Sequence, residues 1–179
     1  YTIIILLSFA FSLFLFEIFL NLKNSKVNYN EIKKIYKHTT GKDYDDRTKI
    51  EVYKELAKKD KDLVVNVYPS LHIEAKKYKD LFLPLSGISN SNTLDCNENG
   101  YFTIFKSDRY GFNNPDIEWD SSKIEYLLVG DSFTHGACVN RPNDIGSVLR
   151  NLSNKSVINI GYGGNGPLLE YATLKEYMP

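Results

Sequence analysis

The stretch IEYLLVGDSFTHGACV, residues 124–139, changes character more sharply than any other part of this 179-residue chain. Its first six residues, 124–129, are apolar except for Glu125, a pattern that is typical of a buried β-strand. Gly130, Asp131 and Ser132 follow directly, and small and polar residues continue the segment. This order predicts a strand whose carboxyl end presents the Ser132 hydroxyl, with an Asp that accepts backbone hydrogen bonds in the turn.

The sequence after this stretch predicts a βαβ unit. The segment PNDIGSVLRNLS (142–153) is typical of a helix, SVINIG (156–161) of a second buried strand, and GPLLEYATLKEYMP (166–179) of another helix. The expected apolar faces of the two helices are Ile145, Val148, Leu149 and Leu152 for the first, and Leu168, Leu169, Tyr171 and Ala172 for the second. Strand, helix and strand at this spacing indicate a parallel sheet. Ligand sites in such sheets lie at the carboxyl ends of the strands, so GDSFTHG and GYGGNG should face one crevice.

The first hundred residues carry weaker signals. Residues 23–45 are polar and rich in Lys and Asn, as a linker would be, and residues 45–60 predict a helix with Ile50, Tyr53, Leu56 and Ala57 on its apolar stripe. A short strand is expected within 62–68 before Pro69, an irregular segment over 84–100, and a strand over 101–106. We therefore divide the chain into residues 1–22, a membrane-proximal stem over 23–100, and an α/β domain over 101–179.

Residues 3–22 predict a single transmembrane helix. They are largely apolar and carry no charge except Glu17, and about 20 such residues cross a hydrocarbon core as a helix. A signal peptide and a buried core helix are the alternatives, but no small-residue cleavage site follows the run. Lysines after the span, such as Lys23 and Lys26, favour the cytoplasmic side for that flank, and only a comparison with the other flank sets the topology.

Composition excludes some classes of partner. Lys plus Arg and Asp plus Glu both number 22, so no overall field points to nucleic acid. Cys96 and Cys138 lack metal-ligand spacing, and we predict no metal and no cofactor. The two cysteines form either a disulfide or a pair of buried thiols.

The two glycine-rich segments together resemble the SGNH (GDSL-type) hydrolase family. GDSFT after an apolar strand, followed after a helix by VINIGYGGNG, matches the first two motifs of that family. The resemblance implies a flavodoxin-like, three-layer domain with a parallel sheet, in which Ser132 is the nucleophile and the amides of Gly164 and Ser132 stabilise the oxyanion. Gly130, Asp131, Asn159 and Gly161 would support the turns. Asn165 would either contact substrate or adopt a positive-φ turn conformation.

The sequence departs from the family after the second motif. Neither the Gly-x-Asn-Asp motif nor the Asp-x-x-His motif, which carries the base, occurs in the 179 residues, so we expect the domain to be incomplete at its C-terminal end. His135 lies one turn beyond Ser132 and is a poor substitute, because it should point along the helix surface without a partner that fixes its tautomer. His38 and His72 are expected to be solvated.

These observations predict a serine esterase that acts on O-acyl groups of envelope carbohydrate or lipid. The alternatives are an O-acyltransferase of the same fold and a catalytically incomplete binding module. The stretch SDRYGFNNP (107–115) is similar to membrane-anchored, envelope-associated family members, although it suggests no chemical role. By this resemblance the soluble domain would face the periplasm or the cell exterior.

Overall fold

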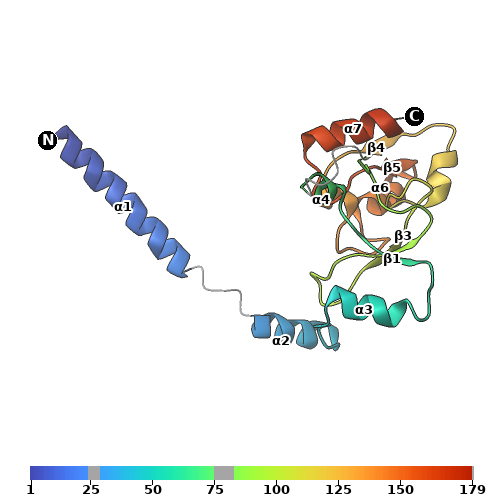
Figure 1. The fold of residues 1–179 in the computed structure, drawn as a ribbon, viewed down its shortest axis with the longest axis horizontal. Coiled ribbons are helices and arrows are strands. Elements are labelled where there is room, and N and C mark those ends of the chain that lie inside the picture. The colour runs from blue at the N-terminus through green and yellow to red at the C-terminus, as the bar shows by residue number, and fades with distance from the viewer. Residues whose placement is uncertain (24–28, 75–82, 179) are drawn as a thin grey trace. The chain divides into compact units, whose positions relative to one another are not determined.

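The chain forms two compact units. The computed structural model describes residues 1–23, 29–74 and 83–178, and Figure 1 shows its elements. The first unit is Tyr1–Tyr44 and the second is Asp45–Pro179. The expected boundary between residues 100 and 101 falls between two strands, β2 (Asn92–Leu94) and β3 (Ile104–Lys106), that pair with each other.

The first unit begins with an apolar helix, α1 (Thr2–Lys23). Its segment Thr2–Leu20 is long and apolar enough to cross a membrane, and none of that segment is buried within the protein. A core helix of a soluble protein would be mostly covered, so this exposure agrees with the expectation for residues 3–22. Lys26, which bears on the topology, lies outside the described residues.

The polar segment that we expected to be a linker contains a second helix, α2 (Tyr29–Thr40). Tyr29 and Tyr36 lie on one face of this helix and pack edge-on against Tyr44, with ring centroids 5.5 and 5.6 Å apart. The ammonium group of Lys33 lies 5.0 Å from the Tyr29 ring centroid. Aromatic contacts therefore order part of a segment whose composition alone indicates a linker.

The second unit begins with a three-stranded sheet in the order β1-β2-β3. Its elements are α3 (Lys49–Leu56), β1 (Leu63–Val65), α4 (Pro69–Glu74), β2 (Asn92–Leu94) and β3 (Ile104–Lys106). Val64 pairs in parallel with Thr93, and Thr93 pairs in antiparallel with Phe105. The central strand lies in the segment expected to be irregular, because only Leu94 of its three residues is apolar.

Helix α3 is present, and two residues of its predicted apolar stripe, Tyr53 and Leu56, pack against the core. Thr48 and Glu51 form a capping box at its start. Val52 is buried with Leu63 and Leu94, whereas Ile50 is 66% exposed. The adjacent sheet, rather than the hydrophobicity of the helix alone, selects the face that is covered.

The remaining elements form the expected βαβ unit. They are η1 (Asp116–Asp120), β4 (Tyr126–Leu128), α5 (Ser132–His135), α6 (Ile145–Ser153), β5 (Val157–Asn159) and α7 (Pro167–Tyr177). Strands β4 and β5 are parallel, with Leu127 opposite Ile158. The fold is therefore a mixture of helices and small sheets, and β5 is fully buried whereas β4 is partly exposed.

The predicted apolar faces of α6 and α7 are largely wrong. Leu152 of α6 is 80% exposed and Leu168 of α7 is 81% exposed. Helix α7 instead packs Leu174 and Tyr177 against a core cluster, which consists of Phe112, Ile158, Ile160 and Tyr162. The helices exist where the sequence pattern places them, but the side that faces the core differs.

Candidate functional site

Ser132 lies at the first position of the short helix α5, directly after the β4 turn. The Asp131 carboxylate caps this helix by accepting a hydrogen bond from the Phe133 amide at 3.0 Å. Gly136 ends the helix in the left-handed conformation, with φ of 76°. Asp131 therefore shapes the turn, as the sequence predicts.

The second glycine-rich segment is hydrogen-bonded to this turn. The Tyr162 amide donates to the Gly130 carbonyl at 3.1 Å, and the side-chain amide of Asn159 donates to the Thr134 carbonyl. The Asn159 Oδ1 atom also accepts from the Gly161 amide at 2.9 Å. Asn159 thus links the two loops.

Gly161 allows these loops to approach closely. A Cβ atom at this position would lie 2.6 Å from Cγ2 of Thr134 and 3.0 Å from the His135 amide nitrogen. Real Cβ atoms do not make contacts of 2.6 Å, so any larger residue would push the Ser132 turn away from the second segment. Gly161 is needed for packing at this site.

Ser132 and Gly164 line the same pocket, whose volume is about 760 Å³. Gly164 has φ of 74°, and a Cβ atom on it would lie 2.5 Å from Oγ of Ser70. The Gly164 amide makes no hydrogen bond within the described part of the chain. A serine hydroxyl and a free backbone amide therefore line one pocket, and a backbone amide is a group that can donate a hydrogen bond to an oxyanion.

The other residues that line this pocket include both apolar and polar side chains. Tyr68, Phe133, Ala137, Val139 and Ile145 provide apolar surface, and Cys96, Glu98, Asn99, Asn143, Asp144 and Gly163 complete the lining. Burial, together with the nearby Asp95 and Glu98 carboxylates, raises the pKa of Tyr68 to about 12. The Tyr68 hydroxyl is therefore protonated at neutral pH and can donate a hydrogen bond.

Asn165 does not line this pocket. Its side chain is 7% exposed, and neither of its polar atoms has a hydrogen-bond partner among the described residues. The positive φ of this turn belongs to Gly164 rather than to Asn165. The structure therefore shows neither the substrate contact nor the positive-φ turn conformation considered from the sequence.

His135 is fully buried and does not line the Ser132 pocket, so it is not positioned to act as a base. Its Nε2 atom lies 4.0 Å from Oδ2 of Asp95, and its ring packs against Tyr162 at 4.7 Å between centroids. Burial lowers the pKa of the imidazole. Among the described side chains no histidine lines the pocket, since His38 lies exposed in the first unit. The side chain of His72 lies outside the described residues.

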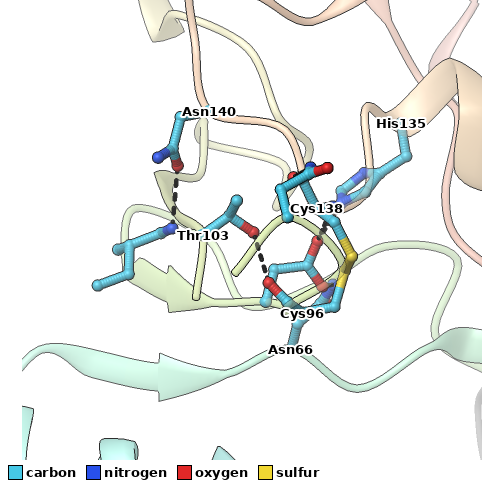
Figure 2. The surroundings of a disulfide bond; sticks show 9 residues. Asn66, Cys96, Thr103, His135, Cys138 and Asn140 are labelled. Carbon is cyan, nitrogen blue, oxygen red and sulfur yellow. Dashed lines mark hydrogen bonds and ion pairs between the residues drawn. A yellow bond between two sulfur atoms is a disulfide. The ribbon is translucent and has the colours of Figure 1, made fainter. Parts of the chain in front are cut away.

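Cys96 and Cys138 form a disulfide, which decides between the two alternatives left open by the sequence. Figure 2 shows that it joins the segment after β2 to the segment after α5. The Asp95 carboxylate accepts from the Cys138 amide at 3.3 Å, and the Asn99 side-chain amide donates to the Cys138 carbonyl at 3.0 Å. The disulfide and these two hydrogen bonds fix one wall of the Ser132 pocket.

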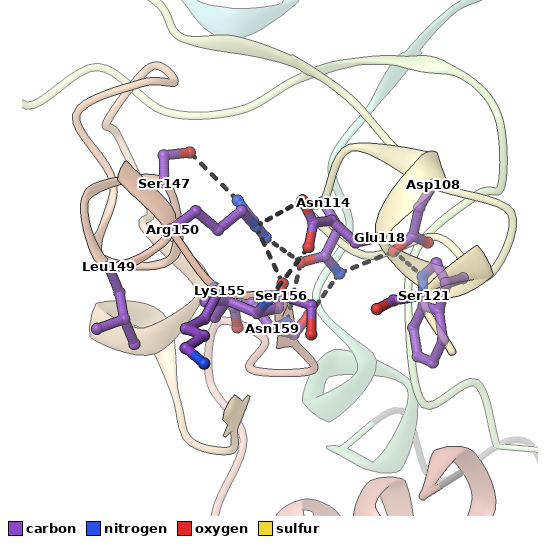
Figure 3. Close-up of polar contacts among 12 residues, drawn as sticks. Asp108, Asn114, Glu118, Ser121, Ser147, Leu149, Arg150, Lys155, Ser156 and Asn159 are labelled. Atoms are coloured by element: carbon purple, nitrogen blue, oxygen red, sulfur yellow. Dashed lines mark hydrogen bonds and ion pairs between the residues drawn. The ribbon is translucent and has the colours of Figure 1, made fainter. Parts of the chain in front are cut away.

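Sequence reasoning missed the buried polar residues whose hydrogen bonds support the site. The fully buried Asp108 carboxylate accepts hydrogen bonds from the Phe112 amide, from the Asn114 side chain and from Nε1 of Trp119. Figure 3 shows this cluster. The stretch 107–115, which suggested no chemical role, therefore forms a compact polar loop around one carboxylate.

Asn114 connects this loop to the second glycine-rich segment. Its side chain donates to the Asn159 carbonyl at 2.8 Å and accepts from the Asn159 amide at 2.9 Å, as a strand partner would. It also accepts from the Arg150 guanidinium at 2.8 Å. Next to it, the Asn113 side chain donates to the His135 carbonyl at 3.1 Å. The run of two asparagines before Pro115 was the signal in the sequence, but it does not identify the partners.

A metal centre is not found in the described part of the chain, where no group of three His, Cys, Asp or Glu side chains could hold an ion. A scan against protein-family models and searches of curated proteins and of solved structures find no match for this chain. The candidate site therefore rests on its own geometry: a serine at a helix start, a free glycine amide and a largely apolar pocket.

Proposed function

We propose that this protein is a membrane-anchored serine esterase of the SGNH type, with Ser132 as the nucleophile. The observation that carries the proposal is that Ser132 and Gly164, from two separate motifs, line one pocket. The parallel pairing of β4 and β5 supports the finer proposal of a flavodoxin-like domain, because both motifs follow carboxyl ends of parallel strands.

In the proposed reaction, Oγ of Ser132 attacks the carbonyl carbon of an acyl ester. The negative charge that develops on the carbonyl oxygen is stabilised by the amides of Ser132 and Gly164. The bond between the carbonyl carbon and the alkoxide oxygen then breaks, and the alkoxide leaves as an alcohol with the proton that Ser132 lost. Water next attacks the acyl-serine, which releases a carboxylic acid and returns a proton to Oγ of Ser132. The family base, a histidine in Asp-x-x-His, has no counterpart in residues 1–179, so we assign that role to none of them.

The disulfide supports an extracytoplasmic position for the second unit, because such bonds persist mainly in oxidising compartments. Helix α1 would then anchor the protein as a single-pass membrane protein. Substrates on an envelope carbohydrate or lipid agree with this location. An O-acyltransferase, in which a sugar hydroxyl replaces water, uses the same nucleophile and oxyanion donors.

A binding module is the second candidate, and one observation favours it. No described histidine side chain lines the Ser132 pocket, and a serine without a base is a weak nucleophile. Such a module would bind an acylated ligand in the pocket without cleaving it.

A fluorophosphonate probe separates the two candidates. The protein is prepared at the full length that its gene encodes, and the covalent adduct is located by intact mass and peptide mapping. An esterase should be labelled at Ser132, and Ser132→Ala should abolish labelling, whereas Ser122→Ala, at an exposed serine outside the pocket, should not. A protein that stays unlabelled under conditions that label a reference esterase is a binding module.

A further inference from the structure

The wall of the pocket beside Ser132 is apolar, which bears on the acyl group that the site would accept. Phe133, Val139 and Ile145 line the pocket together with Ser132 and Gly164. The Phe133 side chain is 81% exposed and Ile145 is 52% exposed. Large apolar side chains gathered at a concave surface are typical of a site that binds an apolar group.

The charge of the lining restricts that group further. The described residues of the pocket include two carboxylates, Glu98 and Asp144, and no Lys or Arg. A dicarboxylic acyl group, or an ester that carries a phosphate nearby, would meet repulsion without a compensating cation. An uncharged acyl group fits this lining.

The size of the pocket also exceeds what an acetyl group needs. Its volume of about 760 Å³ falls within the range of about 300–1,000 Å³ that holds drug-sized ligands. An acyl chain of several carbons and part of the alcohol can therefore occupy it together.

We propose that the Ser132 pocket binds an uncharged alkyl acyl chain along Phe133, Val139 and Ile145, which makes longer acyl esters better substrates than acetyl esters. This inference rests on the proposed function, because the chain is placed by attachment to the carbonyl that Ser132 attacks. We favour an acyl chain over a partner protein because the apolar wall is continuous with Ser132 and Gly164 in a single pocket.

The test is a series of p-nitrophenyl esters from acetyl to octanoyl, cleaved by the full-length protein in lipid nanodiscs, since alkyl detergents would compete for the wall. In each case Ser132 forms the acyl–oxygen bond, p-nitrophenolate leaves, and water regenerates the serine. Burial of one methylene favours binding by an amount that corresponds to about a fourfold rise in kcat/KM. We expect such a rise for each methylene until the chain extends beyond the wall.

Two variants locate the effect. Phe133→Ser should flatten the dependence of kcat/KM on chain length, so that the ratio of octanoyl to acetyl ester cleavage falls. Leu152→Ser is the matched control, because Leu152 is 80% exposed on α6 and does not line the pocket, and this variant should keep the full dependence. A monosuccinyl ester should be cleaved at least tenfold more slowly than the butanoyl ester.

The outcomes separate the two proposals. Cleavage that requires Ser132 but is flat or falls with chain length, or an unchanged dependence in Phe133→Ser, overturns the acyl-chain inference and leaves the esterase intact. Absence of cleavage of every ester overturns the esterase. In that case the binding of fluorinated acetyl and octanoyl sugar esters to Ser132→Ala, measured by ¹⁹F NMR, still decides the inference, which requires tighter binding of the octanoyl ester and its loss in the Phe133→Ser background.

Discussion

Replacement of Asn114 by alanine should strongly destabilise the second unit. The Asn114 side chain is 1% exposed and makes four hydrogen bonds: to the Asp108 carboxylate, to the carbonyl and amide of Asn159, and to the Arg150 guanidinium. Asn114→Ala leaves these four groups in place but removes the side-chain amide to which they are hydrogen-bonded. Buried polar groups without partners are unfavourable, so the loss should exceed that of an ordinary side-chain truncation.

The size of the effect follows from those four hydrogen bonds. Each contributes about 0.5–1.5 kcal/mol net, and together they give an expected loss of about 4 kcal/mol. Most domains have only about 5–15 kcal/mol of folding free energy, so this loss is a large fraction of the total. With a urea m-value of about 2 kcal/mol per molar, the unfolding midpoint should fall by about 2 M.

The single tryptophan provides the assay. Trp119 donates its indole N–H to the Asp108 carboxylate at 2.8 Å, so its fluorescence reports on the same cluster. Urea unfolding is followed by Trp119 emission in nonionic detergent without reductant. Asn143→Ala is the control, because Asn143 is exposed, and this variant should shift the midpoint by less than 0.3 M. A shift of less than 0.5 M for Asn114→Ala would refute the reasoning that the network holds the fold.

The remaining predictions concern the disulfide and His135. Cys96→Ser with Cys138→Ser opens a loop with a sequence separation of 42 residues, which should lower the free energy of unfolding by about 4 kcal/mol; an unchanged urea midpoint would contradict this. Burial lowers the pKa of His135, so below about pH 6.5 the unfolded chain binds a proton that the folded chain does not, and stability should fall by up to about 1.4 kcal/mol per pH unit between pH 6.5 and 5. His135→Gln should remove that slope in urea titrations at several pH values, and an equally steep slope in the variant would contradict the assignment to His135.

Sequence reasoning located the βαβ unit because its signals are local. The apolar runs at 124–129 and 156–161 and the Gly-Asp-Ser turn need no knowledge of distant partners, and β4, α6 and β5 lie where those signals place them. Strand β2 was missed because its residues carry no such local signal. Asn92 and Thr93 show no strand pattern, and their conformation is set by pairing with β1 and β3.

The faces of the helices could not be predicted so well, because exposure depends on what packs nearby. In α7 the sequence favoured Leu168, Leu169, Tyr171 and Ala172 as core residues. Leu169 is buried, but Leu168 and Tyr171 are exposed, and Leu174 and Tyr177 pack against the core cluster instead. Helix propensity and hydrophobicity do not distinguish these sets. The exposed residues Leu168 and Tyr171 remain available for other contacts. Phe133 of α5 is also an exposed apolar residue, and it forms part of the proposed acyl wall.

The polar network was also invisible in the sequence, since its hydrogen bonds join residues far apart. Asn114 and Asn159 are separated by 45 positions and bond through both backbone groups of Asn159. Neither asparagine has a signature that names its partner, and either residue alone is typical of a turn. Only the folded chain shows that the loop at 107–115 supports the segment that contains the proposed oxyanion donor, Gly164.

This arrangement separates the residues that hold the site from those that would react. Asn114 and Asn113 bond to Asn159 and to the His135 carbonyl from one side, and the disulfide fixes the pocket wall through Cys138. An oxyanion donor is effective only when its position is set before the charge develops, because reorganisation during the reaction would raise the barrier. A mild change in the network, such as Asn113→Ser, should therefore affect the reaction of Ser132 with a fluorophosphonate more than it affects affinity for an uncleaved ester. Equal effects on both would mean that the network only stabilises the fold.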